Sequence, residues 1–341
     1  MGFRKIILSG ALCAVAFIGS PAVVRSEPVE KINFMEVIHS LFYAPLYVAQ
    51  GLHYFRDEGI DFDLVAAQGS DKATAALLAG AADIVLAGPE TAVYIETGQS
   101  PDKIRIFAGL TATDGSFLMG RSKQEAFSWK SLKGKTIMGW RKGSAPAIFL
   151  DKALKDNGLD PEKDVTIITN VAIPARMGAF MAGTADYATF FEPDVTKIEQ
   201  AGKGAALANV GQAAGQIDYT VFTTKESYIK AKPKTVQGFT NAIARAEKWL
   251  QSASADEVAK VLAPYFPGVP ATELAASVTR QRDAGLWKTT PLVTPEAIGA
   301  LQDLLIASNV LDAGKKVAYD RIVDPSFAKA ANVEAASRSV K

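Results

Sequence analysis

The arrangement of hydrophobic and polar residues repeats once along the chain. Residues 78–87 read LAGAADIVLA and residues 181–190 read MAGTADYATF, with Gly80 and Gly183 in equivalent places 103 residues apart. Each copy is typical of a helix that ends at a left-handed glycine and is followed by a short buried strand. The repeat therefore predicts two similar structural units in one chain.

The similarity extends upstream of these two strands. Pro45 and Pro146 stand near the start of predicted helical stretches, where a missing N–H costs little, and Gly59 and Gly158 end those stretches. Each unit therefore reads strand–helix–strand–helix–strand, which predicts parallel strands joined by right-handed crossovers. The helical stretches cover residues 43–59 and 144–158, and the strands before and after them cover residues 32–38, 62–65, 136–140 and 165–168.

We expect the two units to form two lobes, because each has its own first strand. One doubly wound domain with duplicated motifs is the alternative. Residues 27–115 and 221–341 are assigned to lobe one and residues 116–220 to lobe two, with crossovers at residues 111–116 and 216–221. Amphipathic patterns predict helices around residues 236–250, 271–286 and 295–308. These helices are expected to cover lobe one and brace the junction between the lobes.

The N-terminal residues have the layout of a secretory signal peptide. Arg4 and Lys5 precede an apolar run over residues 6–19, which is too short to span a bilayer. Cleavage is expected after Ser26, with Ala22 as the other plausible position, and a buried N-terminal helix is the alternative interpretation. Cys13 is the single cysteine and lies in this run, so the mature chain would have no disulfide, cysteine nucleophile or thiolate metal site.

The charge and the rare side chains exclude several classes of function. The formal net charge of +1 becomes −2 when the three basic residues of segment 1–26 are removed, so a nucleic-acid partner is not expected. No later apolar run is long enough for membrane insertion after cleavage. His39 and His53 are the only histidines, which argues against a histidine metal site. We expect no catalytic residue, metal or cofactor, although acid–base chemistry by Glu90, Asp114, Glu192 or His39 stays open.

Ligands of open parallel sheets bind beyond the carboxyl ends of the strands, where helix N-termini present free N–H groups. This rule selects one set of loops in each predicted lobe. The candidate ligand-binding residues are Phe42, Tyr43, Gln68, Gly69, Ser70, Gly88, Pro89, Glu90, Thr111 and Thr113 in lobe one, and Arg141, Gly143, Ser144, Asn170, Phe191 and Glu192 in lobe two.

Each candidate also has a structural interpretation. Ser70 can cap the helix that follows it, and the aromatic pair at residues 42–43 can belong to the core. Arg141 can be a surface charge, although its place before a helix start suits an anion. Glu90 and Glu192 stand beside prolines at corresponding places in the two units. They are either solvated or recognise an amine, an amidine or a ring N–H.

At these loops the sequence resembles the bacterial substrate-binding proteins of ABC importers for nitrate, sulfonates, taurine and thiamine-pyrimidine precursors. The matching segments are FYAPLYVA at residues 42–49, the Gly–Ile pair at 59–60, LAGAAD at 78–83, FEP at 191–193, VTPE at 293–296 and YDRIVDPSF at 319–327. The resemblance implies a type II, Venus-flytrap fold with two α/β lobes and a ligand clamped between them. Phe191 stands where the family usually has Trp, which puts a stacking role for this residue in doubt.

The function expected from the residues and the resemblance is ligand capture by hinge closure. The protein would be a periplasmic monomer that binds a small polar organic molecule containing nitrogen or sulfur. It would deliver this molecule to an ABC permease and, through the permease, to the ATPase. Arg141 and the N–H groups of lobe two would hold an acidic end, and Glu90 or Glu192 a nitrogen end. The alternatives are a cleft enzyme on the same scaffold, such as a chorismate dehydratase relative, and a sensor that presents ligand to a receptor.

Overall fold

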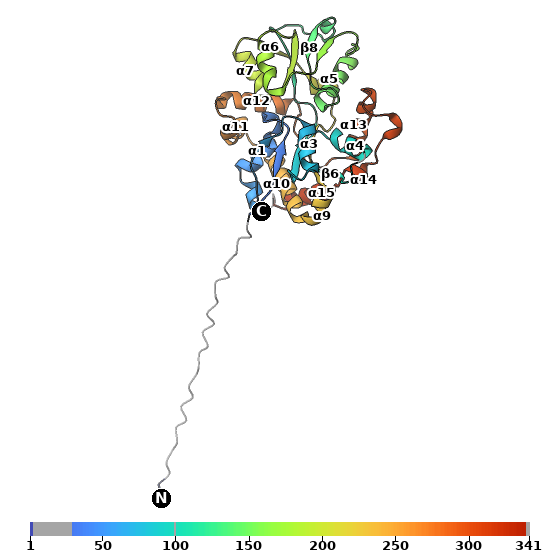
Figure 1. The fold of residues 1–341 in the computed structure, drawn as a ribbon. Helices are drawn as coiled ribbons and strands as arrows, with labels where there is room; N and C mark the ends of the chain where they lie inside the picture. Colours follow the sequence, from blue (N-terminus) through green and yellow to red (C-terminus); the bar gives the residue numbers. More distant parts are fainter. Residues whose placement is uncertain (3–28, 99, 339–341) are drawn as a thin grey trace.

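The structure, a computed structural model, describes residues 1–2, 29–98 and 100–338. Apart from residues 1–2, the predicted signal peptide with its cleavage site and Cys13 lies outside the described residues. The described chain forms two five-stranded sheets with helices on their faces, one sheet in each of two lobes (Figure 1). A two-stranded pair of β1 (Glu30–Lys31) and β3 (Ile60–Asp61) accompanies the first sheet.

The sheet of lobe one has the strand order β4-β2-β5-β12-β6. Its strands are β2 (Phe34–Glu36), β4 (Val65–Ala66), β5 (Ile84–Ala87), β6 (Ile104–Thr111) and β12 (Thr220–Lys225). The strand β2 pairs in parallel with β4 and β5, whereas β12 is antiparallel to both β5 and β6. The predicted parallel pairing of the first three strands is confirmed.

The sheet of lobe two repeats this arrangement, with the order β11-β7-β10-β8-β9. Its strands are β7 (Phe117–Gly120), β8 (Thr136–Met138), β9 (Thr166–Ile168), β10 (Tyr187–Phe190) and β11 (Ala205–Asn209). The strand β8 is parallel to β9 and β10, and β7 is antiparallel to β10 and β11. The strand β7 therefore takes the place in lobe two that β12 takes in lobe one.

Helices cover both sheets. Those of lobe one and the C-terminal part are α1 (Ala44–Gly51), α2 (Tyr54–Asp57), α3 (Ser70–Leu78), α4 (Glu90–Thr97), α9 (Glu226–Ala231), α10 (Pro233–Ser252), α11 (Ala255–Leu262), α12 (Ala271–Asp283), α13 (Pro295–Ala307), α14 (Tyr319–Ile322) and α15 (Ser326–Arg338). Those of lobe two are α5 (Ala145–Asp156), α6 (Arg176–Met181), α7 (Asp194–Gln200) and α8 (Val210–Ala214). Short 3-10 turns lie at Leu41–Tyr43, Trp129–Leu132, Ile173–Ala175, Ala263–Tyr265 and Ala313–Lys315. No helix among these residues is long and apolar enough to cross a bilayer.

The repeated glycines have the conformation that the sequence pattern predicts. Gly80 and Gly183 have φ angles of 78° and 97°, and Gly59 and Gly158 have φ angles of 73° and 80°. All four lie in the left-handed region, which residues with a Cβ rarely adopt. The strands that follow the first pair, β5 and β10, are buried along their whole length.

The predicted helix over residues 43–59 is wrong in one respect, because the chain forms two helices there. His53 has a φ angle of 61°, which separates α1 from α2. Gly51 allows α11 to approach closely, since a Cβ on this residue would lie 2.8 Å from Val261 Cγ1. The predicted strand at residues 62–65 is displaced. Of these residues only Val65 is in a strand: β3 ends at Asp61 beside β1, and β4 begins at Val65 beside β2.

The C-terminal helices cover lobe one and contact lobe two, as predicted. The apolar face of α10 is buried. The centroid of the Phe239 ring lies 4.8 Å from that of Phe55 and 5.0 Å from that of Phe222. The helices α12 and α13 lie beside the junction of the lobes (Figure 1). Arg280 of α12 pairs with Glu192 of lobe two, and the carbonyl of residue 307 accepts a hydrogen bond from Lys155.

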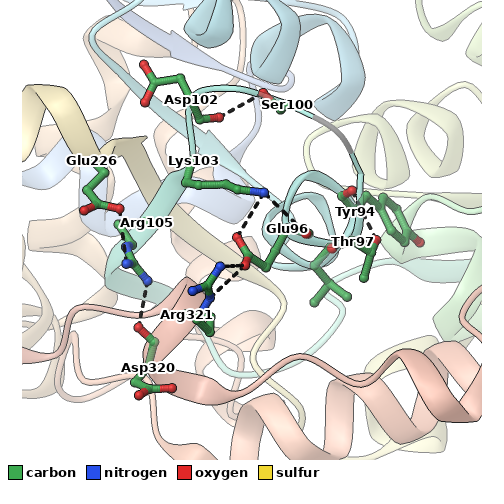
Figure 2. A network of polar contacts seen from close by, with 11 residues as sticks. Tyr94, Glu96, Thr97, Ser100, Asp102, Lys103, Arg105, Glu226, Asp320 and Arg321 are labelled. Atoms are coloured by element: carbon green, nitrogen blue, oxygen red, sulfur yellow. Dashed lines mark hydrogen bonds and ion pairs between the residues drawn. The ribbon is translucent and has the colours of Figure 1, made fainter.

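Ion pairs and hydrogen bonds connect α14, near the C-terminus, with lobe one. Arg321 of α14 donates two hydrogen bonds to the carboxylate of Glu96 in α4, at 2.8 and 2.5 Å (Figure 2). Arg105 of β6 donates to the carbonyl of Asp320 and to the carboxylate of Glu226, so β6, α9 and α14 meet at one place. These contacts place the C-terminal segment on lobe one, although the exact lobe boundaries stay a prediction.

Candidate binding cleft

A cleft of about 760 Å3 lies between the two lobes. It is bounded by the loops that follow the parallel strands of both sheets, and its volume is in the range typical of small-molecule sites. Lobe one contributes residues 37–38 after β2, 68–72 after β4 and Gly88 after β5. Lobe two contributes residues 140–142 and 144–146 after β8, 169–174 after β9 and Phe191 after β10.

The structure brings ten of the predicted ligand-binding residues together around this cleft. They are Phe42, Tyr43, Gln68, Gly69, Ser70, Gly88, Arg141, Ser144, Asn170 and Phe191. Six predicted residues are not among those lining the cleft, namely Pro89, Glu90, Thr111, Thr113, Gly143 and Glu192. Contact with a ligand stays a prediction for the first group, and the second group has other contacts.

Aromatic rings from both lobes form one wall of the cleft. The centroid of the Phe191 ring lies 5.0 Å from that of Phe42 and 5.4 Å from that of Trp140. The ring of Tyr219 meets Phe42 edge-on at 5.4 Å. Phe42 is only 1% exposed, so it belongs to the core as well as to the cleft. Trp140 and Tyr219 were not predicted as site residues, although Trp140 directly precedes a predicted loop.

The charged side chains that line the cleft are mainly basic. They are Lys72, Arg141, Lys142 and Arg176, with Asp71 as their acidic counterpart. Asp71 and Arg141 pair with each other across the lobes at 2.6 Å, which neutralises both charges. Lys142 pairs with Glu162 at 3.0 Å, so Lys72 and Arg176 are the basic groups that leave the cleft positive and favour an anion.

Arg176 is the most deeply buried of these basic groups, at 2% exposure. Its guanidinium donates to the carbonyls of Gly139, Met138 and Thr189, and it lies 3.9 Å from the centroid of the Trp140 ring. Burial lowers the pKa of Arg176 to about 10, so the group keeps its charge at neutral pH. The carboxylate of Asp194 raises this pKa but forms no ion pair with Arg176 among the described residues, so the buried cation can also attract an anion in the cleft.

Glu90 is buried rather than solvated. Its Oε1 accepts a hydrogen bond from the main-chain N–H of Ala145 at 3.2 Å, at the start of α5 in the other lobe. Its Oε2 lies beside Gly88 and has no hydrogen-bond partner among the described residues. Burial raises the pKa of Glu90 to about 7. The side chain therefore joins the two lobes behind the cleft wall.

Glu192 also joins the lobes, and side chains of the protein itself bind its carboxylate. Arg280 donates to it at 3.1 Å, and the hydroxyl of Thr196 donates at 2.8 Å. The main-chain carbonyl of Glu192 accepts from Ser40 Oγ at 2.5 Å and from the N–H of Leu41 at 3.2 Å. The guanidinium of Arg280 therefore takes the place of the ligand nitrogen that we predicted for this carboxylate.

The other predicted residues outside the cleft connect the lobes or lead into helices. The hydroxyls of Thr111 and Thr220 share a hydrogen bond of 2.6 Å, which ties the two crossover segments together. Thr113 donates to the carbonyl of Gly215 at 2.7 Å in the same region. The carbonyl of Gly143 accepts from the hydroxyl of Tyr94 at 3.0 Å, and Pro89 is the N-cap residue of α4.

The acid–base groups that the sequence left open for an enzyme are not found at the cleft surface. Glu90 and Glu192 have the contacts described above. The carboxylate of Asp114 accepts from the N–H of Ser116, and His39 lies between the carboxylate of Glu36 and the carbonyl of Tyr265. Among the described residues, no group of three or more His, Cys, Asp or Glu side chains is placed to hold a metal ion.

Known proteins are similar to this chain in sequence and in fold. The model of a family described as NMT1/THI5 like matches residues 42–254. YtlA of Bacillus subtilis (strain 168), whose name classes it as a binding protein, is 35% identical over 305 residues, covering 89% of this chain and 91% of YtlA.

Two solved structures illustrate the similarity of fold. The alkanesulfonate-binding protein SsuA from Xanthomonas axonopodis pv. citri, bound to MOPS, has a TM-score of 0.70 at 19% identity, covering 88% of this chain and 100% of SsuA. The periplasmic nitrate-binding protein NrtA from Synechocystis PCC 6803 has a TM-score of 0.68 at 16% identity, covering 92% of this chain and 89% of NrtA. The predicted two-lobed α/β fold of periplasmic binding proteins is confirmed.

Proposed function

Because the chain belongs to the NMT1/THI5-like family and has the fold of periplasmic binding proteins, we propose that it is the extracytoplasmic solute-binding component of an ABC importer. Relatives that are named as binding proteins support a solute-binding role. Export through the N-terminal signal peptide, a periplasmic location and delivery to a permease and its ATPase belong to this proposal.

The ligand that the cleft suits best is a small organic anion with a planar or apolar body. The observation that carries this proposal is Arg176, a buried cation without a paired carboxylate, stacked on Trp140 at the cleft wall. The rings of Phe42 and Phe191 provide apolar contact for the body of the ligand. A plain sulfonate or carboxylate is favoured over a ligand with a nitrogen end, which the sequence predicted for Glu90 or Glu192, because both carboxylates are engaged between the lobes.

Hinge closure follows from the way the walls are divided between the lobes. Phe42 and Tyr43 come from lobe one, and Trp140 and Phe191 come from lobe two. A ligand that contacts both pairs binds the closed arrangement more tightly than the open one, and its binding therefore shifts the population to the closed state. The crossovers joined by Thr111 are the hinge in this proposal.

A thermal-shift screen tests the ligand class. The mature chain, unfolded and refolded to remove any bound ligand, is mixed with benzenesulfonate, propanesulfonate, taurine, nitrate or benzoate, and with benzamide and benzylamine. An organic anion at 100 times its Kd should stabilise the protein by about 2.7 kcal/mol. Stabilisation by benzylamine and benzamide without any response to the acids would overturn the proposed ligand class.

Variants connect this response to the cleft. Trp140→Leu should abolish the stabilisation by the anion that binds best. Trp249→Leu is the matched control, because Trp249 lies on α10 away from the cleft lining. If Trp140→Leu folds and binds the anion as the unmodified chain does, the cleft is not the binding site and the proposal is wrong.

A further inference from the structure

A second cavity lies in lobe two behind the wall of the binding cleft. It has a volume of about 410 Å3, lies between α5, β9 and the turn at residues 161–162, and is open to solvent on one side. Trp140, Lys142 and Thr169 line both this cavity and the cleft, so the two are neighbours. All of its lining residues belong to lobe two, which means that its shape does not depend on hinge closure.

The chemistry of the cavity centres on Asp151, which lies half-buried on α5. Its carboxylate forms no hydrogen bond or ion pair within the part of the chain that the structure describes. The lysines around it are bonded to other groups: Lys142 pairs with Glu162 at 3.0 Å, and Lys155 donates to the carbonyl of residue 307 at 2.6 Å. The carboxylate is therefore partly withdrawn from water without a partner, which costs free energy.

Burial and three charged neighbours set the protonation of Asp151. Burial raises the pKa of this carboxyl to about 6; Lys155 on its own helix and Lys142 lower it, while Glu162 at the turn raises it. The carboxyl is charged at neutral pH, because this value lies below 7. The charged residues that line the cavity, Asp151, Glu162 and Lys142, carry one net negative charge together.

We propose that this cavity is a second binding site, which takes a primary ammonium group on a short apolar chain. Asp151 would accept a charge-assisted hydrogen bond from the ammonium group, and the hydroxyls of Thr166 and Thr169 would accept its remaining N–H bonds. Leu150, Val165 and Ile167 provide the apolar wall for the chain. Asp151 and Thr166 line this cavity and not the cleft, so the site is distinct from the one proposed for the anion.

The indole N–H of Trp140 reports on this cavity because the residue forms part of its wall. In the mature chain labelled with 15N, this resonance is assigned with a Trp140→Phe variant and then followed while n-butylammonium chloride is added at pH 7.5. We expect a saturable shift with n-butylammonium, and an apparent affinity at least tenfold weaker for n-butanol and for n-butyrate. Equal responses to n-butanol and n-butylammonium would overturn the proposal without the use of any variant of the cavity.

Because Trp140 also lines the cleft, a variant locates the binding. Asp151→Asn should weaken n-butylammonium binding at least tenfold, and Asp156→Asn should leave it unchanged. Asp156 lies on the same helix but pairs with Lys152 outside the cavity, so it is the matched control. Affinity should also fall as the pH is lowered from 7.5 through 6, because the proton removes the charge of Asp151. Equal affinity in the two variants would place the ammonium elsewhere and overturn the proposal.

Discussion

At the scale of single residues, Glu90 links the stability of the protein to pH. The pKa of this buried carboxyl is about 7 in the folded protein, against a value of 4.5 for an ordinary glutamate. The folded protein therefore binds more protons at this group than the unfolded chain does between these two values. Stability falls as the pH rises through this window, and the loss is complete above pH 7.

Replacing Glu90 with glutamine should remove this loss, because the amide keeps an acceptor for the N–H of Ala145 and carries no charge. Between pH 4.5 and 8 the free energy of unfolding of Glu90→Gln should rise relative to that of the unmodified protein, by roughly 3 kcal/mol at most. Urea unfolding at pH 5 and pH 8 measures this difference. Glu125→Gln, at an exposed position, is the control and should change neither value. A pH-independent difference would show that the carboxyl is charged throughout the range.

The predicted loops line the cleft, ligand contact by their side chains stays a prediction, and several lining side chains were not among those predicted. The strand-end rule located the loops that line the cleft, because the parallel pairing of β2 with β5 and of β8 with β10 brings their carboxyl ends to one edge. Arg176 was missed because it begins α6, beyond the loop that the rule selects. The inward direction of Glu192 could not be predicted, since it depends on Arg280, which lies 88 positions later in the chain.

At the scale of elements, Gly178 and Gly183 of lobe two predict opposite effects on stability for the same substitution of glycine by alanine. Gly178 lies within α6, and Gly183 ends the turn after it with a φ angle of 97°. A Cβ added at either position meets no atom within 4 Å, so contacts do not distinguish them. The backbone conformation alone decides the outcome.

Gly178→Ala should stabilise the protein by about 0.5–1 kcal/mol, because alanine loses less backbone entropy in a helix than glycine does. Gly183→Ala should destabilise it by about 1 kcal/mol or more, because the left-handed conformation strains a residue with a Cβ. Urea unfolding of the two variants provides the comparison. Two variants that changed stability in the same direction would contradict the role given to the Gly80 and Gly183 repeat.

The elements themselves were predictable where the local pattern agrees with the tertiary structure. Strands β5 and β10 are short apolar runs between a glycine turn and a proline, and both were located closely. The break between α1 and α2 was not predicted, because His53 is not a residue that normally takes a left-handed conformation. It coincides with the close approach of α11 at Gly51, and no local sequence pattern contains this contact.

At the scale of the whole molecule, contacts that need no ligand already join the lobes. Asp71 pairs with Arg141, Glu90 accepts from the N–H of Ala145, and Glu192 pairs with Arg280. These contacts stabilise the arrangement in which the lobes meet. The free energy of closure therefore comes partly from these contacts within the protein and partly from the contacts of a ligand in the cleft.

Arg280→Gln tests this sharing without altering a residue of the cleft. It leaves the carboxylate of Glu192, which is fully buried, without its cation. Because Arg280 itself is about one-third exposed, the expected loss of stability is about 1–3 kcal/mol. The radius of gyration in solution should increase, and the affinity for the cleft ligand should fall while the ligand contacts remain.

Urea unfolding and small-angle X-ray scattering provide these measurements. Arg245→Gln is a control, because Arg245 pairs with Asp57 inside lobe one. This variant should leave the radius of gyration and the affinity unchanged. Adding Glu192→Gln to Arg280→Gln should recover part of the lost stability, since the uncompensated charge is removed. An unchanged radius in Arg280→Gln would mean that this pair does not help to hold the lobes together.

The position of β12 between β5 and β6 governs the order in which the chain can complete its structure. Along the chain β5 and β6 precede lobe two and β12 follows it, so the facing edges of β5 and β6 have no partner until the segment Thr220–Lys225 returns to them. The strands of lobe two all lie between residues 117 and 209, so this sheet can assemble first. Pairing between such distant segments is slow, so we expect the sheet of lobe one to be completed after the sheet of lobe two.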